Sequence, residues 1–177
     1  MTGIVVWFTG LPSSGKSRLA ERVQARLTES GRPCCVLDGD RVRRLLQPSP
    51  GYSAREREDF YVTLANLAAE IAQQGWCVLV PATASQRSYR AYARRCAPEF
   101  LEVWLETDAE ECRRRDAKGL YASFARGEVQ GLPGQDEPYE CPESPDVRAF
   151  GAQDEAALDL IVQRLSSQAG SPRPKPG

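Results

Sequence analysis

A glycine-rich octapeptide that ends in a lysine and a serine is the part of this sequence whose spacing points most directly to chemistry. It follows an apolar run, Ile4–Thr9, that is typical of a buried strand, and it fits the phosphate-binding pattern G-x-x-x-x-G-K-[ST]. In such a loop the glycines let the backbone curl around phosphate oxygens, the lysine contacts the β- and γ-phosphates, and the serine hydroxyl ligates Mg²⁺. The residues expected to contact phosphate are Gly10, Ser13, Ser14, Gly15, Lys16 and Ser17. The sequence therefore predicts a site for a nucleoside triphosphate, with Lys16 as a catalytic residue and Ser17 as a metal ligand.

Two aspartates follow the second apolar run of the chain, Cys34–Leu37. No acidic residue follows the later apolar run Trp76–Val80, where a metal-binding aspartate is often found, so the carboxylate beside Mg²⁺ must come from elsewhere. Asp38, at the end of its strand, is the candidate for that carboxylate. The residues leave two roles open for Asp40: a place near the reacting atoms, or an ordinary N-cap for the helix that follows.

The overall composition excludes several classes of function. The 177 residues carry 23 basic and 24 acidic side chains, a balance that gives no sign of a nucleic-acid-binding surface. No apolar run approaches the length of a membrane span, and the start of the sequence lacks the features of an export signal. Histidine is absent, which rules out a serine or cysteine nucleophile paired with histidine, and the six cysteines show no C-x-x-C spacing. We therefore expect a cytoplasmic protein with reduced thiols and small-molecule substrates, and no nucleic-acid or membrane partner.

Strand and helix patterns alternate along the rest of the chain. Besides the apolar runs already named, the sequence predicts a strand at 100–105 and helices starting at Ser17 and at 54–74, 85–97, 108–115 and 154–168. This alternation is typical of an α/β fold, a parallel β-sheet flanked by helices on both faces, with ligands at the carboxyl ends of the strands. We expect one domain over residues 1–169. Within it, about 116–146 is rich in glycine and proline and is expected to form a lid, and residues 170–177 are expected to be disordered.

A series of short motifs resembles those of the adenylylsulfate kinase family of phosphate-loop kinases. After the phosphate-binding loop come Asp-Gly-Asp-Arg-Val-Arg at 38–43, Gly-Tyr-Ser at 51–53 with Arg57, Arg-Asp-Ala-Lys-Gly-Leu-Tyr at 115–121, Gly-Glu-Val at 127–129, Gly134, Asp136 and Pro-Tyr-Glu at 138–140. The resemblance spans residues 4–147. It implies a phosphate-loop kinase fold, transfer of the γ-phosphate of ATP to the 3′-hydroxyl of adenosine 5′-phosphosulfate (APS) to give PAPS, a requirement for Mg²⁺, a mobile lid and a homodimer.

The resemblance also implies roles for individual residues. Asp40 matches an aspartate beside the acceptor hydroxyl, where it acts as a general base or an orienting group. Arg43 and Arg57 match arginines that hold the phosphosulfate group. Arg115, on the phosphate side, and Lys118, on the acceptor side, match cations at the start of the lid that neutralise charge on the transferred phosphoryl group. Without the resemblance, these arginines would be interpreted as solvated cations on helices.

The acceptor half of the site departs from the family pattern. Tyr52 keeps one of the two aromatic side chains that stack on the adenine of APS, but Leu132 replaces the phenylalanine opposite and Gln130 a nearby lysine. Phe60 replaces an asparagine that contacts APS, and Ala84 replaces a serine associated with a phosphorylated intermediate. Stacking of a base on an aromatic ring is worth about 1–3 kcal/mol, so the loss of the phenylalanine is expected to weaken adenine binding.

These departures leave three functions open. The first is APS kinase; the second is a kinase for another small anionic acceptor with a hydroxyl group; the third is a regulator that binds nucleotide without turnover. The intact loop and Asp40 argue against the third function, whereas Phe60 and Leu132 keep the second open. Because Ala84 has no hydroxyl, we also expect direct phosphoryl transfer with no phosphoenzyme.

Overall fold

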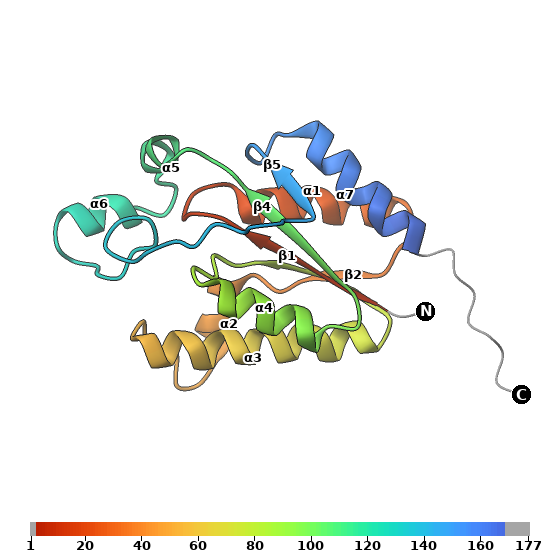
Figure 1. The fold of residues 1–177 in the computed structure, drawn as a ribbon, viewed down its shortest axis with the longest axis horizontal. Helices are drawn as coiled ribbons and strands as arrows, with labels where there is room; N and C mark the ends of the chain where they lie inside the picture. Colours follow the sequence, from red (N-terminus) through yellow and green to blue (C-terminus); the bar gives the residue numbers. More distant parts are fainter. Residues whose placement is uncertain (1–2, 169–177) are drawn as a thin grey trace, which may run out of the picture.

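The structure is a computed structural model that describes residues 3–168, and it contains a parallel sheet of five strands covered by helices on both faces (Figure 1). The strands, in the spatial order β2-β3-β1-β4-β5, are β1 (Ile4–Thr9), β2 (Cys34–Val36), β3 (Cys77–Pro81), β4 (Phe100–Leu105) and β5 (Val147–Ala149). The helices are α1 (Lys16–Glu29), α2 (Gly39–Leu45), α3 (Ala54–Gln73), α4 (Arg87–Cys96), α5 (Ala109–Arg115), α6 (Leu120–Ala125) and α7 (Glu155–Gln168). Each neighbouring pair of strands is parallel, so the predicted α/β fold is confirmed.

Two layers of apolar side chains hold the helices against the sheet. On one face Ile4, Val6 and Phe8 of β1 pack with α1 and α7, and on the other face Val5 and Trp7 pack with α3 and α4 (Figure 1). A strand that is buried on both faces needs apolar side chains at every position, which explains the unbroken apolar run of β1. This core fixes the carboxyl ends of the central strands, where the loops of the candidate site begin.

Most of the predicted elements are confirmed within one or two residues. The long helix predicted at 54–74 is α3, and a capping box between Ser53 and Glu56 fixes where it begins. One detail differs: the helical spacing predicts an apolar face formed by Leu64, Leu67, Ala68 and Ile71, but Leu67 is 40% exposed. The buried face of α3 instead includes Phe60, Tyr61, Ala65, Ala69 and Ala72 besides Leu64 and Ala68.

The 116–146 segment connects α5 to β5 and lies beyond the carboxyl ends of the strands (Figure 1). Its helix α6 and the strand β5 that follows were not predicted, because elements this short show no periodicity. The segment begins at Asp116, which has φ 26 and whose carboxylate accepts hydrogen bonds of 3.0 and 2.9 Å from the backbone of α6. Near its end, the hydroxyl of Tyr139 lies 2.9 Å from Oγ1 of Thr9 in β1. Both ends of the segment are thus tied to the sheet or to its own first helix.

Two expectations from the sequence, on the end of the chain and on the number of domains, are not tested by the structure. The predicted disorder of residues 170–177 lies outside the described residues, and the single domain over 1–169 stays a prediction. Within residues 3–168, no helix combines the length and the apolar character needed to cross a membrane.

Candidate phosphate-transfer site

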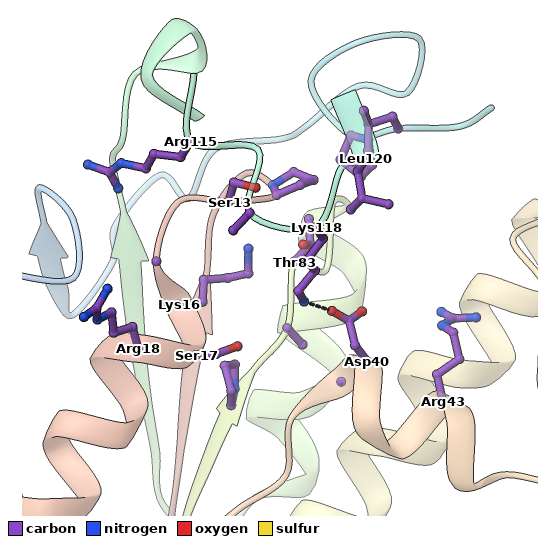
Figure 2. A pocket seen from close by; sticks show the side chains of 18 of the residues that line it. Ser13, Lys16, Ser17, Arg18, Asp40, Arg43, Thr83, Arg115, Lys118 and Leu120 are labelled. Atoms are coloured by element: carbon purple, nitrogen blue, oxygen red, sulfur yellow. Dashed lines mark hydrogen bonds and ion pairs between the residues drawn. The ribbon is translucent and has the colours of Figure 1, made fainter. Parts of the chain in front are cut away.

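A pocket of about 1160 Å³ opens at the carboxyl ends of the strands, where ligands of parallel sheets usually bind. Figure 2 shows Lys16 and Ser17 near its centre, with Arg18 and Arg115 on one side and Arg43 on the other. The predicted site residues that line the pocket are Ser13, Gly15, Lys16, Ser17, Asp40, Arg43, Tyr52, Arg57, Phe60, Arg115, Lys118 and Leu132. The predicted residues outside the lining are Gly10, Ser14 and Asp38. The structure therefore gathers most of the predicted site around one cavity.

The phosphate-binding loop has a backbone conformation that depends on glycine. Gly15 has φ 100, and a Cβ atom added to it would lie 2.9 Å from Cβ of Ala152, so both conformation and space exclude a side chain. The Oγ atoms of Ser13 and Ser14 are buried and have no hydrogen-bond partner within residues 3–168. A curled loop that leaves polar groups unpaired is suited to the oxygens of an anion.

Lys16 lies over the loop from which it comes. Its Nζ donates hydrogen bonds to the carbonyl oxygens of Gly10 (3.0 Å) and Leu11 (2.7 Å). Burial lowers its pKa from 10.5 to about 8, against the opposing effect of the negative charge of Asp40. A phosphate group beside Lys16 would favour the protonated form, because an opposite charge raises the pKa of an amine.

Ser17 and Asp38 form a pair of oxygen donors suited to Mg²⁺. Ser17 Oγ donates to Asp38 Oδ2 (2.6 Å), while Oδ1 of Asp38 accepts from the backbone of Asp40 and Arg41 (3.0 and 3.1 Å). Asp38, not Asp40, is therefore the N-cap of α2. The described part of the chain has no group of three or more metal-ligating side chains, so Mg²⁺ bound at this pair would take its other ligands from phosphate and water. The donor set fits that mode of binding.

Asp40 forms an ion pair with Lys118 from the 116–146 segment (dashed in Figure 2). Burial favours a higher pKa for Asp40, but the hydrogen bond from Lys118 and the charges of Lys118, Lys16 and Arg43 outweigh it and hold the pKa below its ordinary value. Asp40 is consequently ionised at neutral pH, and its carboxylate can accept a hydrogen bond from a hydroxyl group.

Arg43 and Arg57 are buried in the pocket wall. Arg43 donates to two carbonyl oxygens of the loop before α3 (3.1 and 2.6 Å), and Arg57 donates to the carbonyls of Tyr52 (2.8 Å) and Gly131 (2.5 Å). A guanidinium group has five N–H donors, so each arginine keeps donors for an anion. Neither is the solvated helix cation that the residues alone suggested.

Two aromatic rings, those of Phe60 and Tyr52, lie beside Arg43 and differ in how much of each is exposed. The guanidinium carbon of Arg43 lies 3.9 Å from the ring centroid of Phe60 and 4.5 Å from that of Tyr52. Phe60 is 3% exposed, whereas Tyr52 is 60% exposed. Phe60 therefore supports the guanidinium, and Tyr52 is the ring that is open to a ligand.

Leu132 packs inside the 116–146 segment while also lining the pocket. It is buried in an apolar cluster with Cys112 and Tyr121, and its backbone N–H donates to the carboxylate of Asp136 (2.7 Å). Gln130 lines the pocket two residues earlier. Leu132, which is expected to contact the acceptor base, is therefore fixed in place by apolar packing and by the hydrogen bonds of a turn.

Ala84 and Ser85 offer no accessible hydroxyl. Ala84 is buried with φ 43, and its N–H donates to the hydroxyl of Tyr61 (2.9 Å). Ser85 is 1% exposed and lies outside the pocket lining. Direct phosphoryl transfer without a phosphoenzyme stays a prediction, and this burial is consistent with it.

Parts of the pocket wall that were missed from the sequence include Arg18, Tyr61, residues 81–83 at the end of β3, and the loop 150–154 between β5 and α7, where Phe150 is 71% exposed. Arg18 carried a signal, since it lies two residues after the loop lysine. The 150–154 loop was missed because β5 was not recognised, and Tyr61 because it belongs to the apolar pattern of α3.

Known proteins are similar to this chain in sequence and fold over nearly its whole length. A family model described as adenylylsulphate kinase matches residues 2–149. An adenylyl-sulfate kinase of Synechococcus sp. (strain JA-2-3B'a(2-13)) is 39% identical over 168 residues, which cover 94% of this chain and 96% of that protein. The bifunctional enzyme CysN/CysC of Mycobacterium tuberculosis (strain CDC 1551 / Oshkosh) is 39% identical over 168 residues, but these cover only 27% of its length.

A solved structure agrees with these similarities. The Mycobacterium tuberculosis APS kinase CysC in complex with AMPPNP and APS is 39% identical, covers 94% of this chain and 98% of its own, and matches with a TM-score of 0.86. Sequence, fold and the placement of the motifs around one pocket agree: the chain belongs to the adenylylsulphate kinase family.

Proposed function

We propose that this protein transfers the γ-phosphate of ATP to the 3′-hydroxyl of APS, with PAPS and ADP as products. The observation that carries the proposal is one pocket with two halves: Lys16 and Ser17 on a phosphate-binding loop, and opposite them Asp40 with the buried arginines Arg43 and Arg57. The family membership supports it, as does a similar solved structure that holds AMPPNP and APS.

The donor half binds the triphosphate. Lys16 and the N–H groups of the loop hold the β- and γ-phosphates. Mg²⁺, held by Ser17 and Asp38, would neutralise charge on these phosphates. Arg115 lines the pocket on the side away from Arg43 and adds positive charge beside the nucleotide (Figure 2).

The acceptor half orients the hydroxyl that attacks. Arg43 and Arg57 bind the phosphosulfate, and Tyr52 stacks on the base. Asp40 accepts a hydrogen bond from the 3′-hydroxyl and directs it at the γ-phosphate, while Lys118 stabilises the negative charge of the transferred group. The transition state of phosphoryl transfer is loose, so a weakly basic carboxylate suffices to orient the hydroxyl.

A coupled assay of ADP release over a panel of acceptors tests this function. APS is compared with adenosine 5′-monophosphate and with other small phosphates or sulfates that carry a hydroxyl group. We expect release with APS, and its near-complete loss in Lys16→Ala with the fold intact by circular dichroism, because Lys16 stabilises the transferring charge. Activity of this variant within tenfold of the parent would show that the assignment of Lys16 is wrong.

A second candidate function is a kinase for a different small anionic acceptor with a hydroxyl group. The buried ring of Phe60 and the packed side chain of Leu132 favour this second function. The family that this chain resembles has an asparagine and a phenylalanine at these positions, and both contact APS there. Release of ADP with another acceptor but not with APS would establish this function. No release with any acceptor would instead indicate a nucleotide-binding regulator.

We further propose a Mg²⁺ requirement, a homodimer and a cytoplasmic role in sulfate assimilation. The Ser17–Asp38 pair supports the metal, and the six free cysteines suit a reducing compartment. Activity lost with a chelator and restored by Mg²⁺ tests the metal. Light scattering after size-exclusion chromatography tests the dimer.

A further inference from the structure

We propose that the hydroxyl of Tyr61 donates a hydrogen bond to an oxygen of the acceptor and thereby determines acceptor specificity. The inference rests on the proposed function and adds to it a residue that none of the motifs contains. It also explains how the acceptor half retains polar contacts although Phe60 and Ala84 have replaced polar side chains of the resembling family.

The hydrogen bonds of Tyr61 leave one donor unused. The phenol oxygen lies 2.9 Å from the backbone N of Ala84, and a backbone N–H can only donate, so the phenol is the acceptor in this contact. The proton of the phenol therefore points elsewhere, and within residues 3–168 no acceptor is found for it. Tyr61 lines the pocket and is 8% exposed. A buried donor at a pocket wall without a partner is costly unless a ligand supplies the acceptor.

The contacts of Tyr61 place its ring in the acceptor half, because the ring lies 5.3 Å from that of Phe60 and the guanidinium of Arg43 lies 3.9 Å from the same Phe60 ring. Burial raises the pKa of Tyr61, against opposing effects of the Ala84 hydrogen bond and the charges of Arg43 and Arg57, while Asp40 also raises it. The phenol stays protonated at physiological pH, and it lies among the groups proposed to bind the phosphosulfate and the attacking hydroxyl. A neutral donor at this position suits an anionic oxygen, which accepts strong hydrogen bonds.

The ring of Tyr61 is held rigidly by its neighbours. It stacks on Tyr89 with 4.7 Å between centroids and meets the edge of Phe60 at 5.3 Å. The backbone of Ala84 is fixed in turn, because Arg90 donates to its carbonyl (2.5 Å). A donor that is immobilised before the ligand binds loses little entropy on binding, which is what a specificity contact requires.

Tyr61→Phe removes the donor and keeps the ring. The dissociation constant of APS is measured by titration calorimetry in the presence of ADP, so that no transfer occurs, and KM values for APS and ATP are measured by ADP release. We expect the dissociation constant and the KM of APS to rise tenfold or more, while the KM of ATP changes less than twofold. Tyr89→Phe is the matched control: Tyr89 belongs to the same stacked pair but lies outside the pocket lining, so APS binding should not change.

The outcomes separate this inference from the proposed function. Unchanged APS binding in Tyr61→Phe would overturn the inference, as would an equal loss of ATP and APS affinity with a lower melting temperature, which a purely structural role predicts. Binding of APS by the parent protein without turnover would overturn the proposed function, while the comparison of dissociation constants still tests Tyr61. A parent that binds no APS overturns both.

Discussion

Lys16 combines a buried amine with a site for a polyanion. In the free protein its pKa is about 8, because burial disfavours the ammonium form. At pH 8.5 most molecules therefore carry a neutral Lys16, and the negative charge of the triphosphate raises the pKa again. We expect ATP binding to take up protons at pH 8.5, and uptake at Lys16 to vanish at pH 6.5, where the amine is already charged.

Calorimetry in two buffers of different ionisation enthalpy measures this proton uptake. Lys16→Arg is the control, because a guanidinium group stays protonated over the whole range. Equal uptake in the parent and in Lys16→Arg would show that another group titrates.

Lys118 is the second residue whose charge can be tested by itself. Its ammonium group pairs with Asp40 at the meeting point of the two halves of the pocket. Lys118→Met should lower kcat by about 10²-fold or more, since a donor to the transferring group acts mainly on the transition state. The KM of ATP should change little. Lys118→Arg should recover part of kcat, and a variant with normal kcat would remove Lys118 from the mechanism.

At the residue level, the sequence predicted the site residues that belong to motifs. It missed residues that belong to no motif and reach the pocket only in the folded chain. Lys16 and Ser17 were identified by the spacing of the loop and Asp40 by the resemblance to the family, and all three line the pocket. That Asp38 is the helix cap could not be decided from sequence, because either aspartate suits an N-cap. Nothing in the sequence indicated that Tyr61 lines the pocket, since an aromatic residue on the inner face of a helix is ordinarily part of the core.

At the scale of elements, prediction succeeded where apolar periodicity was long. α3 and β1 each carry enough apolar residues to show their period, and both were found within a residue or two. α2, α6 and β5 are too short to do so, and their positions depend on partners distant in sequence, as β5 depends on β4. The same limit explains why the 150–154 loop was missed.

A substitution in the 116–146 segment tests whether this part of the pocket binds the adenine of APS. Leu132 lines the pocket from a packed turn, and Arg57 donates hydrogen bonds both to the carbonyl of the preceding Gly131 (2.5 Å) and to that of Tyr52 (2.8 Å). If the adenine of APS lies between Tyr52 and Leu132, Leu132→Phe restores a stacking surface and leaves the KM of APS equal or lower. Steady-state kinetics measures it, with the KM of ATP as the internal control. A markedly higher KM of APS would favour a different acceptor.

At the scale of the whole molecule, Arg90 links four parts of the fold. Its guanidinium pairs with Glu102 of β4 (2.9 Å) and donates to the carbonyls of Ala84 and Glu140 (2.5 Å each). It therefore joins α4, the sheet, the end of β3 and the 116–146 segment. Both charged side chains are largely buried, at 3% and 13% exposure, so loss of Arg90 leaves Glu102 with only the longer contact to Arg94 (3.7 Å).

Arg90→Ala should lower the free energy of unfolding by about 3–5 kcal/mol, the usual cost of breaking a buried ion pair from one side. Arg94→Ala is the matched control on the same helix. Arg94 pairs with Asp146 (2.8 Å) and, at a longer distance, with Glu102 (3.7 Å), but it is 44% exposed, and its loss should cost less than about 1 kcal/mol. Urea denaturation of both variants measures the difference, and equal costs would show that burial of the pair is unimportant.

The path of the 116–146 segment has a consequence for how this scaffold can diversify. The connection from β4 to β5 consists of α5 followed by this segment, and the two strands are neighbours in the sheet, so the connection leaves and rejoins the sheet at adjacent strands. One contiguous stretch can therefore be exchanged between relatives without altering the order of the strands or the phosphate-binding loop. Such an exchange would replace the pocket-lining residues Lys118, Gln130 and Leu132 while the residues of the phosphate-binding loop, α2 and α3 stay in place, and a laboratory chimera can test it.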